Sequence, residues 1–139
     1  MGEDYNHFDK FLKKLLSSIP GINGVAIVTT EGLPIISVLP RDIDEIRIAA
    51  MTAVLLSLAE IASTEMEKGV FEQLYIKGKE GYLIILQVGP NVILILSTTI
   101  NVKLGLVFLE IKRIFGEFDD DGLATSFPFI PPDKPGGAG

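Results

Sequence analysis

The stretch between Asp42 and Lys68 constrains the fold most, because it carries two apolar seams at helical spacing where a surface helix needs only one. The broad seam consists of Ile48, Met51, Leu55, Leu58, Ala62 and Met66. The narrow seam consists of Ile46, Ala49, Ala53 and Leu56, and its small residues allow another helix to approach closely. We expect one seam to cover the chain's own sheet and the narrow one to meet a partner, as in an interaction module.

Length and composition limit what the chain can be. A chain of 139 residues is most simply one domain, which we place at residues 1–117, before an acidic and then Pro/Gly-rich tail at 118–139. A net charge of −6 with only 12 basic residues disfavours nucleic acid and anionic membranes as partners. No uninterrupted apolar run reaches about 18 residues, so we expect no membrane span. The absence of cysteine excludes disulfides and thiolate metal sites and fits a cytoplasmic protein.

Hydrophobic periodicity predicts the remaining elements. They are helices at Tyr5–Ser18 and Val102–Phe115, and strands at Asn23–Thr30, Leu33–Leu39, Val70–Lys77, Tyr82–Val88 and Val92–Thr98. Short connections make the last three strands antiparallel neighbours. Two of these strands are apolar at consecutive positions, which indicates that both faces of the sheet are covered. The long helix can cover one face and the two terminal helices the other, with Asn101 as N-cap of the last helix and Gly116 as its end.

The order of elements and two stretches of sequence resemble the roadblock/dynein light chain family. The first stretch is the hairpin Gly24–Ser37 with its Glu31-Gly32 turn, and the second runs from Val92–Leu96 through Asn101–Leu106 into the last helix. The resemblance implies an α/β/α sandwich around a five-stranded antiparallel sheet, in the order α-ββ-α-βββ-α. It also implies a prokaryotic, archaeal roadblock-domain protein.

Members of this family form homodimers in which an edge strand pairs with its copy and the long helices lie together. Val70–Lys77 would be such an edge strand, and an open edge with two aromatic residues is an aggregation hazard unless something pairs with it. A twofold dimer would cover both this edge and the narrow seam. The dimer interface is therefore predicted at Ile46, Ala49, Ala53, Leu56, Phe71, Gln73 and Tyr75.

Family members are scaffolds or regulators of small Ras-like GTPases, or light chains of motor complexes. Our leading hypothesis is a non-enzymatic dimer, with itself or with a paralogous roadblock protein, that binds a small Ras-like GTPase without a cofactor. The partner-binding residues would be Glu45, Thr52, Leu56, Glu60 and Ser63. The alternatives are a structural light-chain-type scaffold that binds an extended peptide at a sheet edge, and a small-molecule sensor, which the continuous large aliphatic residues disfavour.

Other candidate sites favour plain structural interpretations. His7 has no nucleophile beside it in the sequence pattern, so a surface role is favoured over catalysis. Asp119–Gly122 lacks the ligand spacing of a calcium loop. We expect Arg41 and Arg47 to pair with Asp44 or Glu45, although a GTPase regulator can also use an arginine to offset transition-state charge. For Phe127–Pro132 two interpretations stay open: a ligand for a partner, or a cover for an apolar patch of its own domain.

Overall fold

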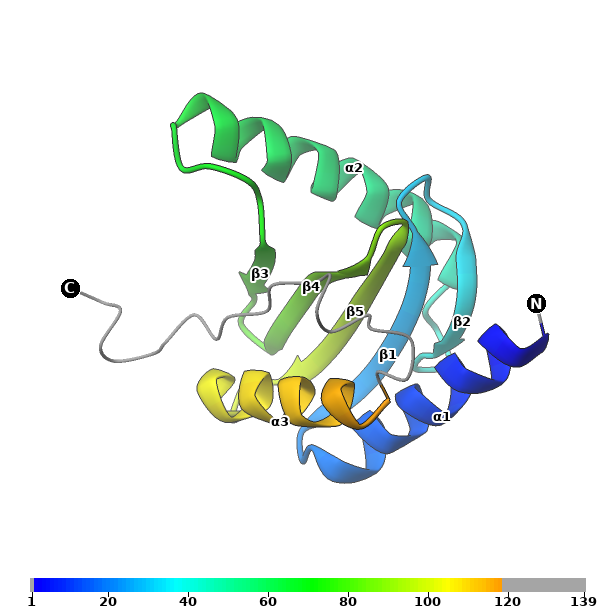
Figure 1. The fold of residues 1–139 in the computed structure, drawn as a ribbon. Helices are drawn as coiled ribbons and strands as arrows, with labels where there is room; N and C mark the ends of the chain where they lie inside the picture. The colour runs from blue at the N-terminus through cyan, green and yellow to red at the C-terminus, as the bar shows by residue number, and fades with distance from the viewer. Residues whose placement is uncertain (1, 119–139) are drawn as a thin grey trace.

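A computed structural model describes residues 2–118, with only the backbone described at residues 2–4, and places three helices around one five-stranded sheet (Figure 1). The elements are α1 (Gly2–Ser18), β1 (Ile22–Thr29), β2 (Pro34–Val38), α2 (Glu45–Glu65), β3 (Gln73–Lys77), β4 (Gly81–Gly89), β5 (Val92–Thr99) and α3 (Leu104–Glu117). The predicted fold, an α/β/α sandwich in the order α-ββ-α-βββ-α, is confirmed. Phe118, the first residue of the predicted tail, is described and packs against the core, whereas the rest of that tail, including Phe127–Pro132, lies outside the described residues.

Every neighbouring pair of strands in the sheet is antiparallel, and the strand order is β2-β1-β5-β4-β3. The centre of the sheet is formed by β1 and β5, where Ile27 lies opposite Leu94. The two edges are β2 and β3. Pro34 stands at the start of edge strand β2, where its missing N–H removes no ladder bond from the interior of the sheet.

Two apolar layers lie on opposite faces of the sheet, because consecutive residues of β4 and β5 point to alternate sides. One layer packs α1 and α3 against Ile84, Leu86, Leu94 and Leu96, with Phe108 of α3 fully buried in it. The other layer packs α2 against Ile85, Ile93 and Ile95. This arrangement is why the strands are apolar at consecutive positions, and it leaves α2 as the only helix on its face among the described residues.

Most predicted boundaries differ from the structure by one to three residues, and three of the differences are informative. The strand predicted from Val70 begins only at Gln73, because its pairing with β4 ends at Leu86, just before the β4 ladder shifts register beyond Gln87. The N-cap of α3 is Lys103, which makes no side-chain capping bond, and not Asn101. Helix α3 also continues through Gly116 to Glu117, since nothing there forces the backbone out of helical geometry.

Candidate interaction surface

The N-terminus of α2 makes two polar contacts, one within its own cap and one to the sheet. The Asp44 side chain accepts a hydrogen bond from the Ile46 backbone N–H at 3.0 Å, as an N-cap does. The Ser37 hydroxyl on β2 donates a hydrogen bond to the Glu45 carboxylate in the first turn of α2. The Ser37–Glu45 contact joins the first turn of α2 to the edge strand β2.

The sheet-facing side of α2 carries Ala49, Thr52 and Leu56, all of which are buried. Of the broad seam, Ile48 and Leu55 pack into the layer on the sheet as expected, whereas Met51, Leu58 and Met66 are exposed. The expectation that Ala49 and Leu56 meet a partner is wrong. The physical reason is the β1–β2 turn, which approaches α2 so closely that a Cβ atom on Gly32 would lie 3.3 Å from the Ala53 Cβ. Small residues in the narrow seam admit the chain's own hairpin rather than a second helix.

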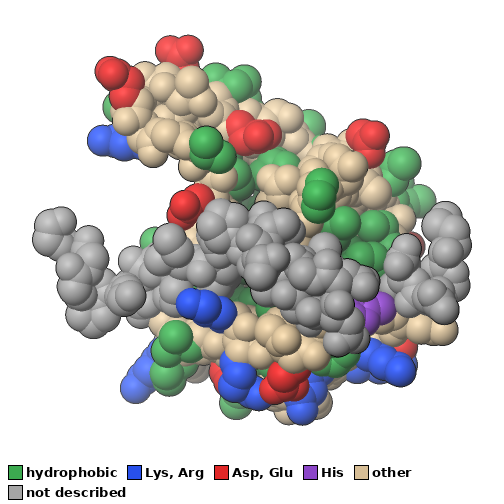
Figure 2. Space-filling model, in the orientation of Figure 1, with side chains coloured by type: hydrophobic (Ala, Val, Ile, Leu, Met, Phe, Trp, Pro, Cys, Tyr) green, Lys and Arg blue, Asp and Glu red, His purple; other side chains and the backbone are tan. Residues whose placement is uncertain are grey.

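The side of α2 that points away from the sheet is apolar and uncovered. Met51, Val54, Leu58 and Ile61, here called the outer seam, are 44%, 59%, 58% and 58% exposed. Their spacing of three, four and three residues is that of a seam between two paired helices. Exposed hydrophobic side chains also lie along α2 in Figure 2. A contiguous apolar stripe of this kind marks a site of contact with another molecule.

The C-terminal part of α2 projects beyond the sheet. Helix α2 packs mainly on β1 and β2, and its far end rises away from β3 (Figure 1). Figure 2 shows a notch beneath this projecting end. The return to β3 begins with Glu67 at a φ of 57° and Gly69 at a φ of 91°, and the Ser63 hydroxyl donates a hydrogen bond to the Gly69 carbonyl at 2.7 Å. The projecting half of α2 thus has apolar surface that no residue between 2 and 118 covers.

The free edge of β3 lies on the same side of the molecule as the projecting end of α2 (Figure 1). The sequence places Phe71, Gln73 and Tyr75 together in the predicted dimer interface, as residues on one face of a strand, but Phe71 and Tyr75 lie on opposite faces of the sheet. Phe71 precedes the strand and packs into the layer between α2 and the sheet. Tyr75 lies on the opposite face, where its ring centroid is 6.3 Å from that of Phe108 in α3. The alternation of a strand does not extend to a residue outside it.

Two charged residues of α2, Arg47 and Glu65, sit at the two ends of the outer seam. Arg47 and Glu65 are both exposed, and neither forms an ion pair with a described residue. The expected pairing of Arg47 or Arg41 with Asp44 or Glu45 does not occur within residues 2–118, because Asp44 caps the helix and Glu45 contacts Ser37. Both charges at the ends of the seam therefore remain available to another molecule.

The predicted partner-binding residues divide into two groups. Thr52 and Leu56 are buried between α2 and the sheet, so their side chains offer no surface to a partner. Glu45 and Glu60 are exposed, and Ser63 is half-buried. Of the predicted dimer residues, Ile46 and Tyr75 are exposed, while Ala53, Phe71 and Gln73 are half-buried. Val54 and Ile61 were not predicted from the sequence as interaction residues, although their spacing with Met51 and Leu58 is that of two paired helices.

Metal-binding side chains and the apolar composition of α2 both bear on what this surface can do. No cluster of three or more His, Asp or Glu side chains that could hold a metal ion occurs in the described part of the chain. By length and composition alone, α2 is apolar enough to cross a bilayer. That composition does not by itself indicate a membrane protein, because a helix covered by a sheet on one side and by a partner on the other needs it too.

Three comparisons with known proteins agree with this fold. A family model described as Roadblock/LC7 domain matches residues 8–98. Uncharacterized protein MJ0310 of Methanocaldococcus jannaschii, an archaeon, is 33% identical over 98 residues, which are 70% of this chain and 85% of that protein. Among solved structures, MglB of Myxococcus xanthus has a TM-score of 0.75 at 23% identity, covering 83% of this chain and 86% of its own.

A second solved structure, of MglB with a tetrameric arrangement, has a TM-score of 0.73 at 16% identity and covers 88% of this chain and 90% of its own. At these identities the two solved structures show a shared fold.

Proposed function

Because the chain belongs to the Roadblock/LC7 domain family, we propose that it acts as a homodimeric, non-enzymatic regulator or scaffold for a small Ras-like GTPase. Proteins of this family are regulators and scaffolds rather than enzymes, and an archaeal relative supports the expected archaeal origin. We expect the protein to work in the cytoplasm, where such GTPases bind their regulators. The structural support comes from the surface of α2 and from the edge of β3.

The observation that carries the dimer is the outer seam. Four large apolar side chains, each more than two fifths exposed, stand at helix-pairing spacing on a helix whose other side is already packed. Burying them against an identical seam removes apolar surface from water at about 25 cal/mol per Å². A solved MglB structure with a tetrameric arrangement is consistent with self-association in this fold.

Charge favours an antiparallel arrangement of the two helices. In a twofold antiparallel pair, Arg47 lies opposite Glu65 of the second copy, Met51 opposite Ile61, and Val54 opposite Leu58. A parallel pair would instead place like charges together at both ends of the seam. The outer seam is thus self-complementary in shape and in charge when the second helix runs the other way.

We further propose that the open β3 edges approach each other in the same dimer. The β3 edge and the projecting end of α2 lie on one side of the molecule (Figure 1). Exposed Tyr75 and Ile76 flank backbone groups that no other described strand covers. Pairing of these groups across the twofold axis would extend the sheet and remove an aggregation-prone edge.

The GTPase surface is proposed at the exposed ends of the stripe of α2 that carries the buried Ala49, Thr52 and Leu56. Thr52 and Leu56 are buried and cannot contact a partner. The predicted partner-binding residues that remain are the exposed Glu45 and Glu60 and the half-buried Ser63. Contacts there would hold the switch regions of the GTPase in one conformation. Regulation would follow from a difference in affinity between the two nucleotide states, since a ligand shifts an equilibrium only by its differential affinity.

The experiment measures binding of the full chain to each small Ras-like GTPase of the same organism, loaded with GDP or with a non-hydrolysable GTP analogue. We expect at least a tenfold difference in Kd between the two states for one of them, which is about 1.4 kcal/mol. The Glu60→Lys variant should weaken that binding, whereas Lys10→Glu, an exposed position of α1 on the opposite face of the sheet, should not. Absent or nucleotide-independent binding to every GTPase tested would contradict this function.

A second candidate function uses the same β3 edge to hold an extended peptide as a light-chain scaffold. The uncovered backbone of Gln73–Lys77 favours it. The two functions differ in what occupies the β3 edge, so competition between an extended peptide and the second copy of the chain distinguishes them. A bound peptide would add a strand to β3 of a monomer, whereas in our dimer that edge is already occupied by the second copy.

A further inference from the structure

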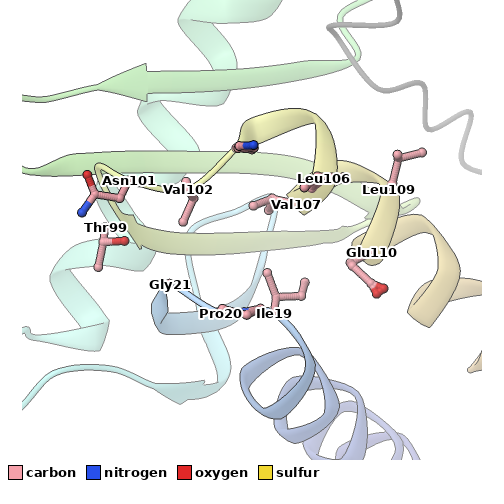
Figure 3. Close-up of a pocket in the computed structure, with 11 residues that line it drawn as sticks. Ile19, Pro20, Gly21, Thr99, Asn101, Val102, Leu106, Val107, Leu109 and Glu110 are labelled. Atoms are coloured by element: carbon pink, nitrogen blue, oxygen red, sulfur yellow. The ribbon is translucent and has the colours of Figure 1, made fainter.

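A surface cavity of about 600 Å³ lies on the face of the molecule opposite α2, between the α1–β1 turn and the start of α3 (Figure 3). Ile19, Pro20 and Gly21 form one wall, and Val102, Leu106 and Leu109 form the other. The cavity is within the usual size range of ligand sites and is lined mainly by apolar groups. It shares no residue with the outer seam or with the β3 edge, so it requires an explanation of its own.

The local backbone explains why the cavity has a fixed shape. The Thr99 backbone N–H donates to the Gly21 carbonyl at 2.8 Å, which ties the end of β5 to the α1–β1 turn. Gly21 has a φ of 93°, and a Cβ atom there would lie 2.3 Å from the Val102 Cγ1. Val102 can therefore rest on the turn only because position 21 is glycine.

The two leucines on the wall of α3 are not used by the core of the protein. Helix α3 packs on the sheet through Val107, Phe108 and Ile111, whereas Leu106 and Leu109 are 59% and 54% exposed. Positions three residues apart share one side of a helix, so the two side chains form a continuous apolar wall. Exposed leucines at the rim of an apolar cavity indicate an apolar occupant.

We propose that this cavity, here called the α3 groove, binds the segment Phe127-Pro128-Phe129-Ile130-Pro131-Pro132 of the same chain. The inference goes beyond the proposed function and does not depend on it. The segment, which lies outside the described residues, carries three large apolar side chains and no charge. Its prolines restrict the free chain, so less conformational entropy is lost on binding to an apolar groove.

The length of the connecting chain permits this contact within one molecule. Leu109 lies about 12 Å along the axis from Glu117, where α3 ends. The residues between Phe118 and Phe127 can span at most about 30 Å, which exceeds this distance. A tether of this length gives an effective concentration in the millimolar range, so even weak intrinsic affinity fills the groove.

Charge and shape along α3 also suit a chain that runs back over it. The connecting stretch contains Asp119, Asp120 and Asp121, and α3 exposes Lys112, which has no ion pair within residues 2–118. A Cβ atom on Gly116 would have no neighbour within 4 Å, so the end of the helix presents open space there. The acidic stretch would therefore pass a free cation before the apolar segment reaches the groove.

The test uses the full chain and limited digestion with chymotrypsin at the Phe129–Ile130 bond. Cleavage should be slow in the parent chain and about tenfold faster in the double variant Leu106→Asp/Leu109→Asp, because the open population governs the rate. Leu33→Asp, a change to an equally exposed leucine on the β1–β2 turn, should leave the rate unchanged. Equal rates in the parent chain and the double variant would overturn the proposal.

A second measurement locates the contact. Methyl–aromatic nuclear Overhauser effects should join the Leu106 and Leu109 methyls to the Phe127 and Phe129 rings, and should disappear in Phe127→Ser/Phe129→Ser. They should persist in Leu123→Ser, a change before the segment. Absence of these effects in the parent chain would contradict the proposal, as would effects seen only between differently labelled molecules. The dimer mass measured alongside is expected to be the same in all variants, which keeps this test separate from that of the proposed function.

Discussion

Arg47 and Glu65 lie on one line along the outer side of α2, about five turns and about 27 Å apart, with Met51, Val54, Leu58 and Ile61 between them. Both charges are exposed and make no ion pair within residues 2–118. The helix thus has a positive beginning, an apolar middle and a negative end on one face. An identical helix running the other way matches this pattern at every position.

Charge reversal tests the antiparallel register. Arg47→Glu and Glu65→Arg should each weaken the dimer about two- to thirtyfold, because each exposed ion pair contributes roughly 0.2–1 kcal/mol and twofold symmetry repeats it. The double variant should recover most of the loss. Sedimentation equilibrium provides the Kd, and Arg41→Glu, outside α2, serves as the control. Failure of the double variant to recover affinity would refute this register.

Leu58→Asp tests the apolar contact itself. Leu58 is 58% exposed in the single chain, so the fold should tolerate aspartate there, but burying that carboxylate in a helix pair is unfavourable. We expect the dimer Kd to rise at least about a hundredfold, with an unchanged circular dichroism spectrum. Leu33→Asp, at a leucine that is 62% exposed, should leave the Kd unchanged. If both variants dimerise like the parent chain, α2 does not form the interface.

Two glycine-to-alanine changes test packing within the fold. A Cβ atom at Gly81 would lie 1.9 Å from the Thr98 carbonyl oxygen in the neighbouring strand, so Gly81→Ala should destabilise the protein by about 1–3 kcal/mol. Gly116→Ala enters open space near the end of α3 and should stabilise by up to about 1 kcal/mol. Denaturant unfolding measures both, and a harmless Gly81→Ala would show that β4 and β5 are farther apart.

The ion pair of α3 predicts a pH dependence. The hydrogen bond from Arg113 lowers the pKa of Glu110, and the positive charges of Arg113 and Lys14 act in the same direction. A carboxylate with a lowered pKa contributes stability above the ordinary glutamate range, and this contribution is lost as the pH falls through the lowered value. Carboxyl NMR titration should show the lowered pKa of Glu110. In Arg113→Gln it should move back towards the ordinary value, and an unmoved titration would exclude this cause.

The order of elements followed from periodicity, because each strand and terminal helix has a clear apolar pattern and short turns limit the topology. The rotation of α2 did not, because apolar residues surround that helix almost evenly and no seam is distinguished by composition. Ala49 is buried where the Gly32 turn approaches α2 and where α2 packs on Ile85, Ile93 and Ile95 of the sheet. Such contacts between distant segments are not visible in a helical repeat.

The start of edge strand β3 could not be predicted from residue type either. Val70 and Phe71 favour strands by residue type, yet the strand begins at Gln73, where the available ladder of β4 begins. The α3 groove could not be found from sequence either, because it depends on Gly21 and Val102 meeting across a long separation. Leu106 and Leu109 looked like ordinary positions of a packed helix until their exposure was known.

The most direct test of the account is the sedimentation-equilibrium mass of the unmodified chain over a range of concentrations. We predict a species of twice the 15.1 kDa chain mass that falls to a single chain in Leu58→Asp. A mass of one chain at every concentration, with the methyls of Met51 and Leu58 as accessible to a soluble paramagnetic probe as in Leu33, would contradict it.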